Sequence, residues 1–126
     1  MAQLQFAEEV LWQLQEKNPR FHPRAFLLVL SALNHVIDQL PQRRHISGRE
    51  LAEGVRELAL DRFGLLARTV LGHWGIRTTQ DLGEIVFALV ESGVLVKQEE
   101  DRMEDFRDVY DFEEVFEAAY PWGGHL

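Results

Sequence analysis

The chain has 126 residues, a formal net charge of −8 and no cysteine. This length fits one domain with a single hydrophobic core, and the lack of cysteine excludes disulfide bonds and cysteine-ligated zinc. The first residues do not resemble a secretory signal, and the longest apolar run (residues 25–30) is far shorter than the roughly 20 residues of a membrane-spanning helix. We therefore expect a soluble, cytoplasmic protein without a membrane partner.

Two helices are expected in the first third of the chain. Apolar residues recur at helical spacing over residues 4–16, and this helix ends before Pro19, because proline disfavours helical geometry in the preceding residue. The second helix covers residues 23–40 and carries apolar side chains on several faces, which predicts neighbours on several sides. Trp12, at the flank of the first apolar stripe, is expected to cover the core, and the alternative is that it binds a partner.

A capping box marks the start of a third helix over residues 48–63. Ser47 and Glu50 have the spacing at which a serine and a glutamate satisfy each other's free backbone amides. Gly54 lowers helix propensity by about 1 kcal/mol relative to alanine, so we expect another helix to cross closely there. The polar, basic connection over residues 41–47 is expected to be an exposed loop.

The order of elements in the C-terminal half is typical of a winged helix. A short helix over residues 65–74 precedes a second helix over residues 79–92, which Thr78 and Asp81 cap and Gly93 ends. The runs over residues 94–98 and 106–112 are expected to form the strands of an antiparallel hairpin with an acidic loop. A last short helix is expected to end near residue 119.

These elements predict a mostly α-helical single domain over residues 1–126. Its N-terminal helices take residues 4–63, and a tail takes residues 120–126. Between them, residues 65–119 form the winged-helix-like half, which consists of a helix-turn-helix and a two-stranded β-hairpin.

The outward face of the second helix in this half does not favour DNA binding. With its apolar stripe turned to the core, that face shows Gln80, Gly83, Glu84, Phe87 and Glu91, without lysine or arginine. DNA binding depends mainly on neutralising phosphates, so we do not expect nucleic acid as the partner. The alternative, a nucleic-acid-associated regulator, would have to use the basic residues Arg43, Arg44, Arg49 and Arg77.

Acidic residues are concentrated in the expected hairpin and the segment after it. The window over residues 97–117 carries ten carboxylates and three basic residues, so it holds nearly all of the net charge. This pattern is typical of a solvated acidic face, or of a docking surface for a basic partner. The docking residues would be Glu99, Glu100, Asp101 and Asp105. A calcium loop is not expected, because the window lacks the central glycine of such loops.

Recognisable catalytic and metal-binding motifs are missing from the sequence. The histidines form no metal-ligand pair at helical spacing, and there is no nucleophile elbow or phosphate-binding glycine loop. We therefore expect no catalytic residue, no metal and no cofactor. An enzyme whose carboxylates converge only in the folded chain remains an alternative.

Three aromatic residues are the remaining candidates for binding a partner. Phe87 lies opposite the apolar stripe of its own helix, and Tyr120 and Trp122 lie in the tail. Packing against the protein itself is the competing interpretation for each. From the acidic segment and these aromatics we expect a non-enzymatic protein-binding or adaptor protein. Its partner would be a protein with a basic surface, or a second copy of the chain.

Three runs taken in order resemble a family of small bacterial proteins of unassigned function. They are SGRELAEGVRELALDRFG, WGIRTTQDLGEIVFALVESGVL and DFRDVYDFEEVF. The resemblance covers the chain from about residue 6 to residue 116. It implies a free-standing small bacterial protein and assigns no functional residue to this chain.

Overall fold

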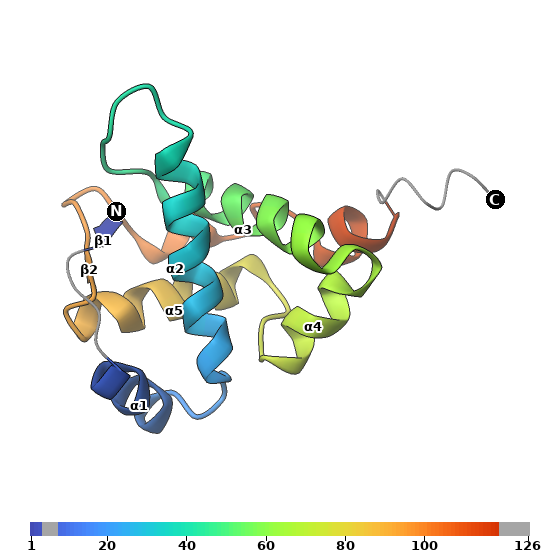
Figure 1. Cartoon of the computed structure of the whole chain (residues 1–126), viewed down its shortest axis with the longest axis horizontal. Helices are drawn as coiled ribbons and strands as arrows, with labels where there is room; N and C mark the ends of the chain where they lie inside the picture. Colours follow the sequence, from blue (N-terminus) through green and yellow to red (C-terminus); the bar gives the residue numbers. More distant parts are fainter. Residues whose placement is uncertain (4–7, 119–126) are drawn as a thin grey trace.

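A computed structural model describes residues 1–3 and 8–118. Within these residues the chain is mostly helical, as predicted, and the five α-helices and two short strands are arranged as Figure 1 shows. They are α1 (Glu8–Lys17), α2 (Pro23–Asp38), α3 (Gly48–Phe63), α4 (Ala67–His73), α5 (Thr79–Glu91), β1 (Ala2–Gln3) and β2 (Leu95–Val96). Three shorter helical turns are η1 (Gly64–Leu66), η2 (Met103–Phe106) and η3 (Glu114–Ala118). None of the described helices is long and apolar enough to cross a lipid bilayer.

α2 is the central helix, and its burial on several sides confirms the prediction from its apolar faces. It crosses α3 and α5 (Figure 1) and also packs against α1. Its most deeply buried side chains include Phe26, Val29 and Leu33. The helix begins at Pro23, and the Nδ1 atom of His22 accepts a hydrogen bond of 3.0 Å from the backbone amide of Arg24.

Gly54 allows α3 to approach α2 closely, as its position inside a helix led us to expect. A Cβ atom at Gly54 would lie 2.3 Å from Cγ2 of Val36 and 3.3 Å from the carbonyl oxygen of Ala32. The predicted capping box is also present. The amide of Glu50 donates to Oγ of Ser47 at 3.1 Å, and the amide of Ser47 donates to Oε1 of Glu50 at 2.9 Å.

The helix-turn-helix of the C-terminal half is formed by α4 and α5. Thr78 and Asp81 cap α5 reciprocally. Gly93, just beyond its end, has a φ of 83°, a conformation that glycine adopts at least cost. Both features agree with the sequence-based prediction.

The predicted β-hairpin is wrong. β2 pairs in antiparallel fashion with β1, so that Ala2 lies opposite Val96. The second expected strand, over residues 106–112, is instead the end of η2 followed by an irregular segment, in which Asp108 has a φ of 47°. Because this backbone conformation departs from the extended one, it interrupts any strand there.

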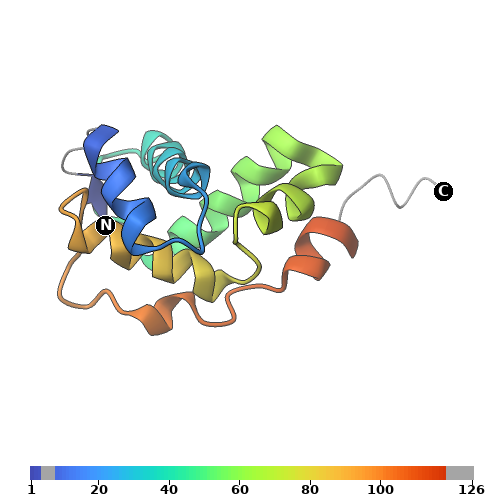
Figure 2. The ribbon, with the colours of Figure 1, turned by 90° about the horizontal axis from the view of Figure 1, so that it is seen from below.

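Residues 97–113 form a strap that runs along one side of α5 (Figure 2). The strap contacts α5 and α3 through η2. Its apolar residues Phe106 and Phe112 are buried in the helical core. The alternation that suggested a strand therefore reflects burial against helices, and the described part of the C-terminal half lacks the two-stranded wing.

Trp12 does not cover the core, contrary to our expectation. It is the most exposed of the large apolar side chains in the described part of the chain, at 69%. Leu14, two positions further along α1, is almost fully buried. Since two residues turn an α-helix by about 200°, Trp12 lies on the opposite face.

Candidate functional site

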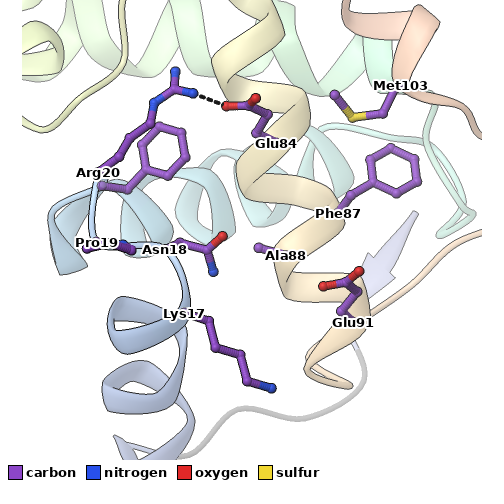
Figure 3. A pocket seen from close by; sticks show the side chains of 10 residues that line it. Lys17, Asn18, Pro19, Arg20, Glu84, Phe87, Ala88, Glu91 and Met103 are labelled. Carbon is purple, nitrogen blue, oxygen red and sulfur yellow. Dashed lines mark hydrogen bonds and ion pairs between the residues drawn. The ribbon is translucent and has the colours of Figure 1, made fainter.

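A groove of about 450 Å³ lies between α5, the turn after α1 and the first residue of η2. We call it the Phe87 groove, because it is lined by Phe87 of α5, a residue that the sequence suggests as a candidate for partner binding (Figure 3). The residues that line it are Lys17, Asn18, Pro19, Arg20, Phe21, Glu84, Phe87, Ala88, Glu91 and Met103.

The apolar part of the groove is formed by Phe87 and Met103, whose side chains lie side by side in Figure 3. Phe87 is half-buried, and Met103 is 39% exposed. Ala88 and Phe21 are buried and contribute to the floor. An unbranched methionine beside an aromatic ring gives an apolar surface that adapts to different side chains.

Arg20 forms the charged wall of the groove together with α5. Its guanidinium forms ion pairs with Glu84, drawn in Figure 3, and with Asp81. Asp81 is held in turn by the backbone amides of Arg77 and Thr78, which donate to its Oδ2 at 2.8 and 3.1 Å. The Arg20 guanidinium also lies 4.6 Å from the centroid of the Phe21 ring. These contacts fix the wall and neutralise much of the arginine's charge.

The acidic docking residues proposed from the sequence fall into two groups. Glu99 and Glu100 are exposed at the start of the strap. Asp101 is only 6% exposed, and its Oδ2 accepts a hydrogen bond of 2.8 Å from the amide of Gln98. Asp105 accepts one of 3.0 Å from the amide of Arg102. Asp101 and Asp105 therefore hold turns of the strap, and Asp101 in particular is not available to a partner.

The four arginines of the nucleic-acid alternative lie among carboxylates or apart from one another. Arg44 forms an ion pair of 2.9 Å with Glu50, and Arg43 is exposed in the loop before α3. The other two arginines each line a surface cavity together with acidic side chains. The cavity of Arg49 is also lined by Glu100, Asp101, Glu104 and Asp105. The cavity of Arg77 is also lined by Asp108, Asp111 and Glu114. This arrangement does not build one continuous basic surface.

The face of α5 that would enter a DNA groove is partly covered. A Cβ atom at Gly83 would lie 3.0 Å from atoms of Phe106, so the strap sits directly on that position. Glu84, the next residue, is engaged by Arg20. The outward positions expected from the sequence are therefore partly used for packing within the protein.

Comparison with known proteins adds no family assignment. The chain matches no family model, no curated protein and no solved structure. The groove is therefore identified as a candidate site from its geometry alone.

Some site residues escaped the sequence analysis, and others lie outside the described structure. Arg20 follows a proline in a turn, and Met103 lies in the segment predicted to be a hairpin loop, so no local sequence pattern marks either residue. Tyr120 and Trp122 lie beyond the described residues, and the tail proposal stays a prediction. Within residues 1–3 and 8–118, no group of three side chains is arranged to hold a metal ion.

Proposed function

We propose that this protein is a non-enzymatic protein-binding module, and that the Phe87 groove receives an apolar side chain from a basic segment of a partner protein. The observation that carries the proposal is the apolar pair of half-buried Phe87 and exposed Met103 in a groove with charged walls. Aromatic and methionine side chains surrounded by polar groups are typical of the centres of protein interfaces.

The charges around the groove favour a basic partner. Glu84 and Glu91 lie about one turn from Phe87 on either side along α5, and Glu91 forms no ion pair with any residue that the structure describes. Of the two cations that line the groove, Arg20 is already paired with two carboxylates and Lys17 offsets one more charge, so the preference for a basic segment comes from the acidic surroundings of the groove. Exposed glutamates at the start of the strap and the net charge of −8 add to a field that attracts cationic segments.

The same features favour a protein over a nucleic acid or an enzyme substrate. Phosphates would meet the carboxylates beside Phe87, and the arginines that could neutralise them are dispersed. The carboxylates of the strap that are best held, Asp101 and Asp105, accept hydrogen bonds from backbone amides. These hydrogen bonds stabilise turns of the strap, which explains the positions of both carboxylates without a catalytic role.

Selection from a displayed library of random peptides tests the proposal. We expect selected peptides to carry lysine or arginine around an aromatic or aliphatic residue. Met103→Glu and Phe87→Ala should each weaken their binding about tenfold or more, as hot-spot truncations do. Circular dichroism and thermal melting of both variants check that the fold is retained.

A matched pair of charge reversals separates specific docking from general attraction. Glu91→Lys changes a wall of the groove, and Glu113→Lys makes the same change in net charge at an exposed residue that does not line the groove. Only the first should strongly reduce peptide affinity. The proposal is wrong if no peptides are enriched, if the enriched peptides are acidic, or if both charge reversals have equal effects.

A further inference from the structure

A second apolar cavity, of about 350 Å³, lies between α2, the end of α3 and the end of α4. We call it the Trp74 cavity. Its apolar walls come from Leu27, Leu28, Phe63 and Trp74, and Arg24, Ser31 and Arg62 complete the lining. The volume is within the range of pockets that enclose a ligand group.

The aromatic wall of the Trp74 cavity is held in place from two sides. The ring of Phe63 meets that of Trp74 edge to face, with centroids 5.6 Å apart and an angle of 85° between the planes. The ring of His22 stacks on Trp74 at 6.3 Å and 24°. Such packing fixes the indole before any partner arrives, which reduces the entropy cost of binding.

Two exposed arginines give the cavity a basic rim. Arg24 and Arg62 form no ion pair with any residue in the described ranges, whereas Arg20, Arg56 and Arg68 all do. In a chain with a net charge of −8, two unneutralised cations beside an apolar cavity favour an occupant that is both acidic and apolar.

The exposed face of α1 has the complementary chemistry. Trp12 is 69% exposed, and Glu9 and Glu16 are exposed three positions before it and four positions after it. These spacings place the three side chains on one side of the helix. Neither glutamate forms an ion pair with a described residue. An exposed indole between two carboxylates is therefore an acidic, apolar projection.

We propose that the Trp74 cavity binds Trp12 of a second copy of the chain, with Glu9 and Glu16 of that copy facing Arg24 and Arg62. Both members of the complementary pair belong to one sequence, and this is the argument for a second copy as occupant. The guanidinium groups of Arg24 and Arg62 are also suited to cation–π contacts with the faces of an inserted indole. This surface is separate from the Phe87 groove, so the two proposals stand independently.

The predicted contact joins two different surfaces of the chain. Each copy offers one projection and one cavity, so two copies can insert Trp12 reciprocally in a two-fold dimer, or copies can associate head to tail in a larger ring or an open chain. Because exposed ion pairs form the rim, added salt should weaken the association.

Analytical ultracentrifugation with two complementary variants tests this contact. Trp12→Ala removes the projection, and Leu27→Asp places an acidic, shorter side chain in the cavity wall; both residues are exposed in the single chain. We expect the wild type to associate as its concentration rises, and each variant alone to be monomeric. An equimolar mixture should form a species of two copies and no larger one, because one intact projection meets one intact cavity.

Reversed charges provide a second arm of the test. Arg24→Glu with Arg62→Glu should abolish association, and mixing with the Glu9→Arg, Glu16→Arg variant should restore it. The matched control, Arg43→Glu with Lys97→Glu, changes two exposed cations outside the cavity by the same charge and should associate like the wild type.

The proposal is overturned by any of three results. The wild type stays monomeric at all concentrations, a single variant associates like the wild type, or the mixture of Trp12→Ala and Leu27→Asp stays monomeric although both are folded by circular dichroism. Association of Leu27→Asp alone, with Trp12→Ala monomeric, would indicate a symmetric contact through Trp12 instead.

Discussion

The ring of Phe106 lies directly against Gly83, where an added Cβ atom would come within 3.0 Å of three Phe106 atoms. The same ring lies against Gly48, where a Cβ atom would approach it to 2.8 Å. One aromatic side chain from the strap thus fits between α3 and α5 because both helices have glycine at the contact. This fit holds the strap on the helical core.

We expect Phe106→Ala to lower the free energy of unfolding by about 3–5 kcal/mol, because it removes a fully buried aromatic ring and leaves a cavity. Urea denaturation measures the loss, and hydrogen exchange should show the strap losing protection before α2 does. Phe106→Leu, which keeps most of the volume, should cost less. A loss below about 1 kcal/mol for the alanine variant would mean that the strap does not depend on this contact.

Gly54 and Gly72 provide a matched pair for the crossing of α2 and α3. Gly54→Ala should destabilise the protein by about 1–3 kcal/mol, because the new Cβ would overlap Cγ2 of Val36. A Cβ atom added at Gly72, in α4, would meet no atom within 4 Å, so Gly72→Ala should stabilise by up to about 1 kcal/mol through helix propensity. Chemical denaturation of both variants gives the comparison. Equal effects of the same sign would contradict the close crossing.

Glu50 should contribute to stability in a pH-dependent way. The Arg44 guanidinium, and then the Ser47 amide, donate hydrogen bonds to its carboxylate and lower its pKa from 4.5 to about 2. A carboxylate with a lowered pKa stabilises the fold above its unfolded-state pKa, and this contribution is lost as the pH falls from about 4.5 towards about 2.

Glu50→Gln keeps a capping side chain but removes the charge. Because the site is partly exposed, we expect a cost of only about 0.5–1 kcal/mol at pH 7. Denaturation at a series of pH values should show this difference shrinking below pH 4.5, the reference value of the free side chain. Glu113→Gln, at an exposed position, serves as the control. If the difference in the free energy of unfolding between Glu50→Gln and the wild type stays constant down to pH 2, Glu50 does not have a lowered pKa in the folded protein.

Tyr110 should remain protonated until the protein unfolds in alkali. Burial raises the pKa of its hydroxyl well above the usual value of 10, and the hydroxyl donates a hydrogen bond of 2.7 Å to the carbonyl oxygen of Ala52. A phenol with a raised pKa stabilises the fold below its unfolded-state pKa, and this contribution falls as the pH rises beyond it.

Tyr110→Phe tests this expectation. Losing the hydrogen bond should lower the free energy of unfolding by about 0.5–1.5 kcal/mol at neutral pH. The chain has two tyrosines, so an ultraviolet titration of the wild type should show one ionisation that coincides with unfolding. That late step should be missing from the variant. If it persists, the late ionisation belongs to Tyr120.

The parts of the fold that the sequence predicts well depend on residues close together in the chain. Ser47 and Glu50 lie within one turn, as do Thr78 and Asp81, so their capping contacts form wherever the helices are placed. The hairpin failed for the opposite reason. β2 takes its partner from the first residues of the chain, and alternating apolar residues fit either a strand or an irregular segment packed on helices.

The residues of the candidate site also differ in how far the local sequence reveals them. Phe87 could be found from its position opposite an apolar helix stripe, but Met103 and Arg20 reach the groove from separate segments whose positions depend on the whole fold. Trp12 was misplaced although local geometry was sufficient. Its separation of two residues from Leu14 puts it on the far side of α1, whereas its place at the flank of the apolar stripe had suggested burial.

The pairing of Ala2 with Val96 encloses all five α-helices in a single loop. Closing so long a loop is entropically unfavourable until other contacts have brought its ends together. Two residues in each strand cannot hold such a closure alone. We therefore expect the packing of α2 with α3 and α5 to precede this strand pairing in folding. The small sheet would then close the chain after the helices have assembled.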